Sequence, residues 1–161
     1  MTALFRAALT TGLVLVMGLL GGCSGSDDPA APPRIRYGED VCSRCAMIIN
    51  EEAHAAAYRT AAGEVRVFDD LGEMLLDHRE RQDSVDHYFV HDFETREWLH
   101  AETAFYVAGG DVRTPMGFGV VALASRSRAE AVRERVGGHV VTFRDLLEQP
   151  QLTAPPKHER H

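Results

Sequence analysis

The sequence is short of basic residues. Its 17 lysines and arginines stand against 24 aspartates and glutamates, a formal charge of −7 over 161 residues. Loss of an N-terminal leader that contains Arg6 would make this charge −8. Such an excess of negative charge argues against nucleic acid as a partner, and against a polybasic contact with anionic lipid.

Motifs of the common enzyme classes are also absent. The chain has no G-x-S-x-G nucleophile elbow, no phosphate-binding glycine loop and no H-E-x-x-H pair. Catalysis by a cysteine and a histidine is conceivable, from Cys42 or Cys45 with His54 or His91. Two cysteines so close together are more typical of a metal loop than of a nucleophile, so we do not expect an enzyme.

Long apolar runs are confined to the N-terminus. Residues 7–20 form an almost uncharged apolar stretch behind Arg6, and Leu20-Gly21-Gly22-Cys23 follows it. The stretch is too short for a comfortable transmembrane helix and is typical of a signal peptide. Its end is similar to a bacterial lipobox, in which the cysteine is lipidated and becomes the new N-terminus. The alternative is a plain signal peptide with an incidental cysteine.

We therefore expect residues 1–22 to be a lipoprotein signal peptide and Cys23 to be the lipidated residue. Residues 24–33 are polar and rich in proline, so residues 23–37 are expected to form a flexible tether. The signal peptide and the lipobox-like end together predict a lipoprotein of the bacterial cell envelope that faces the periplasm and contacts the membrane through the lipid on Cys23.

Cysteine itself is scarce, and lipidation of Cys23 leaves Cys42 and Cys45 as the free thiols. They form a CxxC pair, and Met47 follows two residues later. Thiolate and thioether are soft donors that favour copper(I), zinc or iron–sulfur chemistry. A CxxC pair alone is ambiguous between copper(I), structural zinc and a redox pair or disulfide. The thioether favours copper(I), unless Met47 only fills a gap in the core.

The periodicity predicts strands and helices in a repeated order. Strands are expected near 53–59, 64–68, 88–93, 104–108, 117–123 and 139–143, with helices at 70–81 and 128–136 and a helical turn at 145–147. Asp69-Asp70 is expected to cap the first helix, and Ser125 or Ser127 the second. Each half thus has the order β-β-α-β.

We predict an α+β fold of two consecutive ββαβ units packed together. The first unit covers residues 38–99 and carries the CxxCxM loop, and the second covers residues 100–149. Residues 150–161 are expected to be a disordered tail.

Four further side chains are candidate ligands. Met116 lies between a proline and a glycine in a predicted loop, and it could approach the CxxCxM loop if the two units pack face to face. Filling a surface gap is the alternative for Met116. Met74, His54 and His91 are weaker candidates, because Met74 suits the core and the histidines sit on predicted strands, although imidazole would complete a copper(I) set.

Taken together, these motifs resemble the NosL family, the lipid-anchored accessory proteins of nitrous oxide reductase. The resemblance covers residues 38–147, and its order and spacing are more specific than any one motif. It is carried by the segments 40–49 (DVCSRCAMII), 67–74 (VFDDLGEM), 114–119 (TPMGFG), 88–92 (YFVHD), Trp98 and 105–107 (FYV).

The resemblance implies a fold of two ββαβ units related to that of organomercurial lyase. It implies a periplasmic copper(I) metallochaperone that passes its metal, through an ABC-type accessory complex, to apo nitrous oxide reductase during maturation in denitrification. The ligand positions that carry over are Cys42, Cys45, Met47 and Met116. Many members have glycine at the position of Ala46, and relatives often have a third cysteine where this chain has Glu73.

Alternative functions stay open at this point. The protein could be a copper- or zinc-binding lipoprotein that serves another client, with zinc at the same thiols, or a CxxC thiol–disulfide oxidoreductase. A copper(I) carrier would bind copper(I) tightly, and a structural zinc module would unfold when chelators remove its metal. An oxidoreductase would have a cysteine with a depressed pKa.

Overall fold

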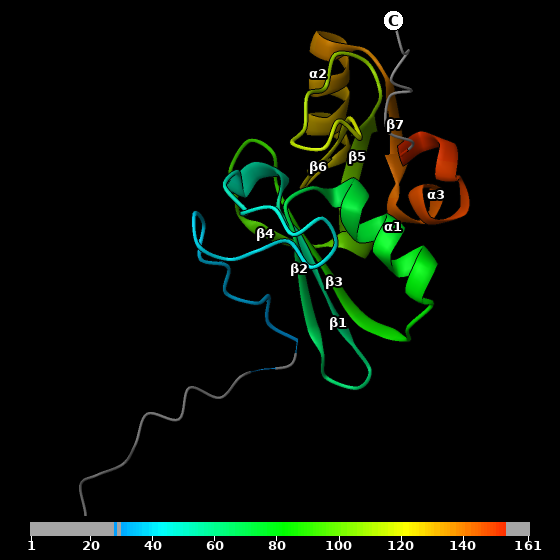
Figure 1. The fold of residues 1–161 in the computed structure, drawn as a ribbon. Coiled ribbons are helices and arrows are strands. Elements are labelled where there is room, and N and C mark those ends of the chain that lie inside the picture. The colour runs from blue at the N-terminus through cyan, green and yellow to red at the C-terminus, as the bar shows by residue number, and fades with distance from the viewer. Residues whose placement is uncertain (1–27, 29, 154–161) are drawn as a thin grey trace, which may run out of the picture.

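Two antiparallel sheets and three short α-helices make up the folded body (Figure 1). The protein is described by a computed structural model for residues 28 and 30–153. In chain order the elements are η1 (Glu52–His54), β1 (Ala56–Thr60), β2 (Val65–Phe68), α1 (Leu71–Arg81), β3 (Val85–His91), β4 (Trp98–His100), η2 (Ala101–Thr103), β5 (Phe105–Ala108), β6 (Val120–Leu123), α2 (Arg126–Val136), β7 (His139–Thr142), α3 (Phe143–Glu148) and η3 (Pro150–Thr153).

The predicted repeat of ββαβ order is present in both halves. The first sheet has the strand order β2-β1-β3-β4 and the second has β6-β5-β7. In the first half β2 and β3 pair with the two edges of β1. In the second half β6 and β7 pair with the two edges of β5 in the same way. The α+β class is confirmed. The first sheet also gains β4, which continues the sheet from β3.

Helix α1 starts where the sequence predicted. Asp70 is its N-cap, and the Asp70 carboxylate accepts a hydrogen bond from the Gly72 backbone N–H at 2.8 Å. The helix ends at Arg81, and the backbone of its C-cap, Gln82, is left-handed. Its buried face includes Met74 and Leu75, which join the main hydrophobic core. Figure 1 shows α1 lying beside β1 to β3, with its N-terminal end toward the second sheet.

Asp92, just after β3, ties the two sheets together. Its carboxylate accepts a hydrogen bond from the Ala124 backbone N–H at 2.7 Å, and Phe93 N–H donates to the carbonyl of Ala122 at 2.8 Å. Burial alone would raise the pKa of Asp92, but backbone N–H donors and the Arg128 guanidinium hold it below its usual range. The two units therefore meet through a buried carboxylate that is ionised at neutral pH.

The ends of the folded body differ from the expectation. Ile35 is buried in the main core and the Tyr37 hydroxyl bonds to His91, so the predicted tether gives way to packed chain before residue 37. At the other end η3 buries Thr153, so disorder does not hold for residues 150–153 of the predicted tail. The signal peptide, Cys23 and residues 154–161 lie outside the described residues. Within the described part of the chain, no helix is long and apolar enough to cross a bilayer.

Candidate metal site

The two thiols lie on a tight loop closed by its own backbone. Val41 and Ile48 form an antiparallel bridge, and the Cys42 N–H donates to the carbonyl of Met47 at 2.8 Å. Within this loop the Ala46 N–H donates to the carbonyl of Cys42 at 3.1 Å. The paired cysteines are thus held by a hairpin-like turn that backbone hydrogen bonds close.

This turn places Ala46 in the left-handed region, at φ +60°. A side chain with a Cβ is strained there, by about 1–2 kcal/mol, whereas glycine is not. Ala46→Gly is therefore expected to stabilise the protein by about 0.5–1 kcal/mol, after the greater freedom of glycine in the unfolded chain is subtracted. Urea unfolding measures this change.

Ala62→Gly is the matched control, because Ala62 is also an exposed turn residue but lacks a positive φ. This substitution is expected to destabilise the protein by up to about 1 kcal/mol. Destabilisation by both glycines would show that the Ala46 backbone is not strained in solution.

The residues between the cysteines dock the loop onto the first unit. The Ser43 N–H donates to the carbonyl of Val67 on β2 at 2.8 Å, and its hydroxyl accepts from the Val67 N–H at 3.0 Å. The Arg44 guanidinium lies 2.9 Å from the Glu73 carboxylate and pairs with Glu80, both on α1. The loop is therefore fixed between the edge of the sheet and the helix.

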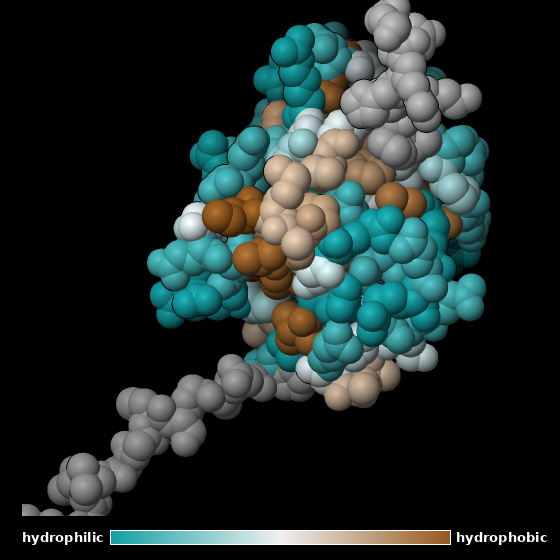
Figure 2. Space-filling view, viewed as in Figure 1, coloured by the Kyte–Doolittle hydropathy of each residue, from teal (hydrophilic) through white to brown (hydrophobic). Residues whose placement is uncertain are grey.

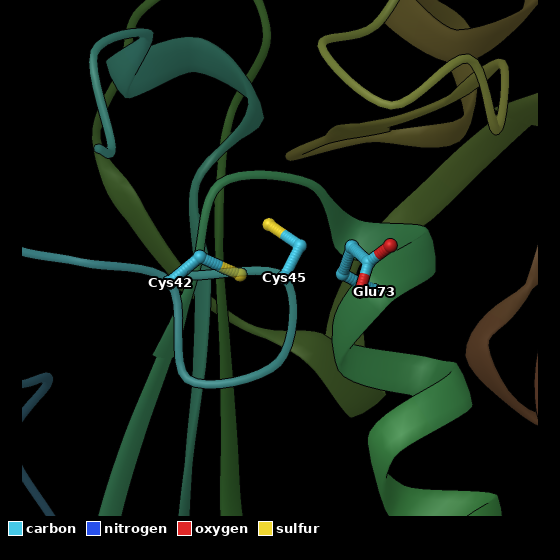
Figure 3. A group of neighbouring side chains, drawn as sticks. All are labelled: Cys42, Cys45 and Glu73. Carbon is cyan, nitrogen blue, oxygen red and sulfur yellow. The ribbon is translucent and has the colours of Figure 1, made fainter. Parts of the chain in front are cut away.

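A cluster of three ligand atoms results from this docking (Figure 3). The sulfurs of Cys42 and Cys45 and a carboxylate oxygen of Glu73 all lie within 4.8 Å of one another. Neither cysteine forms a disulfide. Over residues 28 and 30–153 this is the one group of three or more cysteine, histidine or acidic side chains close enough to share a metal ion.

The environments of the two thiols differ. Cys42 is only 3% exposed, and burial raises the pKa of its thiol to about 12, although backbone N–H groups of Cys45, Arg44 and Asp69 oppose the shift. Cys45 is half-buried, and its sulfur lies 3.6 Å from a carboxylate oxygen of Asp69. Metal binding at Cys42 must therefore displace a proton, after which the N–H groups stabilise the thiolate.

The loop that carries Met116 is hydrogen-bonded to Asp70, at the start of α1. Asp70 accepts hydrogen bonds from the Met116 N–H at 3.0 Å and from the Thr114 hydroxyl at 2.5 Å. The neighbouring residue, Asp69, faces Cys45. Two successive aspartates thus contact the two loops, Asp69 the thiol loop of the first unit and Asp70 the methionine loop of the second.

The other sulfur candidates have contrasting positions. Met47 is 52% exposed on the thiol loop, next to the exposed Ile48 and close in sequence to the exposed Val41. Figure 2 shows apolar surface on the face where this loop lies in Figure 1. Met74 is fully buried in the hydrophobic core on α1. The thioether of Met47 is therefore accessible to an incoming ion, whereas that of Met74 is packed.

Neither histidine candidate lies in the cluster of Cys42, Cys45 and Glu73. Both ring nitrogens of His91 are engaged, with the Tyr37 hydroxyl at 2.7 Å and the carbonyl of Arg96 at 2.6 Å. His54 packs on Phe93, and burial lowers the pKa of its imidazole. His91 has no free nitrogen for a metal in this arrangement.

The sequence patterns do not place Asp69 beside the thiols, and they single out position 73 only as one where relatives often have a third cysteine. The prediction that Asp69-Asp70 caps the helix is right for Asp70 alone. The signal was available in the spacing, since positions four apart at a helix start lie on one face. With that spacing the side chains of Asp69 and Glu73 both lie near the thiol loop.

Comparison with known proteins identifies the family. The model of the NosL family matches residues 36–150, which is almost the whole of the described body. The chain belongs to the NosL family. The predicted resemblance is confirmed.

Two individual NosL proteins are similar to the chain. The copper-binding lipoprotein NosL of Stutzerimonas stutzeri is 26% identical over 160 residues, which cover 91% of this chain and 84% of that protein. The crystal structure of the copper chaperone NosL from Shewanella denitrificans matches with a TM-score of 0.61 and 21% identity, over 71% of this chain and 96% of that one. The second likeness shows that the NosL fold is shared.

The NosL match includes every ligand candidate but not Cys23, which precedes residue 36. In chemical terms this corner of a NosL fold offers two thiols, an accessible thioether on the same loop, and one buried carboxylate.

Proposed function

We propose that this protein is a lipid-anchored, periplasm-facing copper(I) carrier. It would pass copper(I), through an ABC-type accessory complex, to apo nitrous oxide reductase. The observation that carries the proposal is the pair of free thiols, Cys42 and Cys45, held side by side on a loop at the surface of a NosL fold. The names of the two similar NosL proteins, a copper-binding lipoprotein and a copper chaperone, support it.

The arrangement suits a metal that must be bound and then released. Copper(I) is satisfied by a few soft donors, and the two thiols supply them with negative charge. Cys42 is buried and Cys45 is half-buried, so one side of the ion would stay open to an incoming ligand. Met47, on the same loop, is exposed and could supply a thioether.

The thiol chemistry favours a carrier over an oxidoreductase. A CxxC nucleophile needs an accessible thiol with a depressed pKa. The first cysteine here is 3% exposed, and its pKa is raised by burial to about 12. Such a thiol is a poor nucleophile but becomes a good ligand once a cation replaces its proton.

A structural role for zinc has less support. The loop is closed by backbone hydrogen bonds and docked by Ser43 and Arg44, and the main hydrophobic core extends through both sheets. A fold with these supports does not need a metal to hold its shape. We therefore expect chelators to leave the protein folded.

The test of the proposal is an anaerobic titration of the reduced, lipid-free protein with copper(I) against a chromophoric competing chelator. One tightly bound copper(I) per chain is expected, and its absence would overturn the carrier function. Mixing the loaded protein with apo nitrous oxide reductase, with and without the accessory complex, tests the recipient. Copper retained by the carrier in both mixtures would point to another client.

Met116 provides a sharper test of the ligand set. Met116→Ala is expected to weaken copper(I) binding by about tenfold or more without unfolding the protein, because even the loss of a group that only orients a metal ligand costs about 10–100-fold. Met116→Leu is the matched variant, since it keeps the bulk of the side chain and removes the sulfur. Competitive titration measures both, and equal affinities for wild type and Met116→Leu would remove the thioether from the site.

A further inference from the structure

A buried ion pair lies beneath the thiol loop of the first unit. The side chains of Arg66 on β2 and Asp77 on α1 are only 14% and 7% exposed. Arg66 Nε and Nη2 donate to the two carboxylate oxygens of Asp77 at 2.8 and 2.9 Å, and the buried Tyr58 hydroxyl donates to the same carboxylate at 2.6 Å. Two parallel bonds of this kind fix the plane of the guanidinium.

The same guanidinium reaches the backbone between the two cysteines. Arg66 Nη2 donates a hydrogen bond to the carbonyl of Ser43 at 3.0 Å. Ser43 directly follows Cys42, and Figure 3 shows that the loop lies beside α1. One arginine therefore connects the buried Asp77 to the peptide that leads from Cys42 to Cys45.

We infer that Arg66 is the positioning residue of the thiol loop, which keeps Cys42 enclosed and the two sulfurs close enough to share one ion. Its consequence for metal binding rests on the proposed copper(I)-carrying function, because it concerns the same pair of cysteines. The inference adds that this arginine already holds the loop in the metal-free protein.

The contacts of Ser43 explain how one arginine holds the turn. The Ser43 N–H donates to the carbonyl of Val67, and the Ser43 hydroxyl accepts from the Val67 N–H. The carbonyl is the remaining polar group of this residue, and Arg66 is its partner. The peptide units on both sides of Ser43 are thus fixed, and the first of them begins at Cys42.

The second arginine contact of the loop has a different effect. Arg44, in the loop itself, pairs through its side chain with Glu73 and with Glu80 on α1. A long arginine side chain has many rotamers, so it can stay paired while the backbone that carries it moves. Arg66 bonds to the backbone, and therefore restrains the path of the chain.

The geometry calls for an arginine at position 66. A guanidinium presents several N–H donors in a rigid plane, whereas a lysine ammonium is a compact charge on a flexible stem. The hydrogen bonds to Asp77 raise the pKa of Arg66 above its usual range, so the guanidinium keeps all its donors. A lysine here is expected to pair with Asp77 and to release the Ser43 carbonyl.

The experiment measures alkylation of each cysteine by iodoacetamide in the reduced, metal-free and lipid-free protein. Iodoacetamide reacts with accessible thiolates, and peptide mass spectrometry gives separate rates for Cys42 and Cys45. In wild type the half-buried Cys45 is expected to react faster than Cys42, which is 3% exposed. In Arg66→Lys the Cys42 rate is expected to rise by about tenfold or more, because labelling follows the population of the open loop.

Glu64→Gln is the matched control. Glu64 is an exposed partner of the same guanidinium, at 3.2 Å from Nη1, and its loss leaves the bond to Ser43 in place. The Cys42 rate in Glu64→Gln is expected to stay within about threefold of wild type, since exposed ion pairs contribute little. If Arg66→Lys does not fold, the double variant Arg66→Met, Asp77→Leu replaces it, because it removes the whole buried pair and leaves no unpaired charge.

Low concentrations of urea separate a loosened loop from general instability. Alkylation that requires global unfolding accelerates steeply with urea, whereas alkylation through local opening of the loop does not. The Cys42 rate in Arg66→Lys is expected to depend little on urea. In a competitive titration the same variant is expected to bind copper(I) about tenfold more weakly than wild type, the loss typical of a group that orients a metal ligand.

Three results would overturn the inference. These are an unchanged Cys42 rate in Arg66→Lys, a faster rate that rises with urea as steeply as global unfolding, and an unchanged copper(I) affinity in that variant. Failure of the carrier function looks different. Wild-type protein that binds no copper(I), but protects Cys42 in a manner that depends on Arg66, would overturn the proposed cargo and leave Arg66 as the residue that positions the loop.

Discussion

Replacement of both Cys42 and Cys45 by serine is expected to abolish stoichiometric copper(I) binding. The hydroxyl of serine is a hard donor and stays protonated at neutral pH, so the variant loses both anionic soft ligands at once. The remaining donors, the thioethers of Met47 and Met116 and the carboxylate of Glu73, cannot replace two thiolates. Affinity should fall by several orders of magnitude, to adventitious binding that a competing chelator removes completely.

The double variant should remain folded. Cys45 is half-buried, and the backbone N–H groups that act on the Cys42 thiol can donate to a serine hydroxyl instead. Urea unfolding before and after copper(I) addition checks this, because copper(I) should stabilise wild type and not the variant. A double variant that keeps one tight copper(I) ion would contradict the assignment of the thiols as the site.

The two single substitutions, Cys42→Ser and Cys45→Ser, should weaken copper(I) binding to different extents. Cys42 is enclosed, and the peptide N–H groups of Arg44, Cys45 and Asp69 act on its sulfur. Those groups stabilise the thiolate that metal binding creates. Cys42→Ser is therefore expected to be more damaging than Cys45→Ser, whose sulfur is the more exposed and exchangeable ligand.

Features with local causes were predictable from the sequence. The start of α1 follows from the short polar side chain of Asp70 before an apolar run, and the start of α2 from Ser125. Strand β2 follows from its alternation. The repeated ββαβ order follows from these local signals taken in sequence, which is why the architecture could be predicted although the halves differ in sequence.

The candidate site was only partly predictable, because it depends on contacts between distant segments. The CxxCxM spacing indicated a metal loop, but nothing local to Glu73 shows that Arg44 draws α1 toward that loop. His91 illustrates the opposite case. Its residue type suggests a ligand, yet Tyr37 and the carbonyl of Arg96 occupy both of its nitrogens. Such pairings arise from tertiary packing, which periodicity does not report.

Asp70 joins the two loops of the candidate site, and its replacement by alanine should have the largest effect on stability. The residue is fully buried, and its carboxylate accepts hydrogen bonds from the backbone N–H groups of Gly72 and Met116 and from the hydroxyl of Thr114. Loss of an N-cap costs about 1 kcal/mol. The Met116 N–H and the Thr114 hydroxyl are only part-buried, so each of them left unpaired adds about 1 kcal/mol, the low end of the cost of an unpaired buried donor. A total loss of about 3 kcal/mol is expected in urea unfolding.

The matched control is Ser125→Ala at the N-cap of α2. Ser125 caps that helix through the Arg128 N–H, and its hydroxyl otherwise contacts that of Ser127 in the same turn, so about 1 kcal/mol should be lost. Copper(I) affinity separates the two variants further. Asp70→Ala should weaken it in the same direction as Met116→Leu, because the Met116 loop is no longer held at the thiol corner, whereas Ser125→Ala should not. Equal behaviour of the two variants in both measurements would mean that Asp70 is an ordinary helix cap, and that the methionine loop finds its place beside the thiols by other contacts.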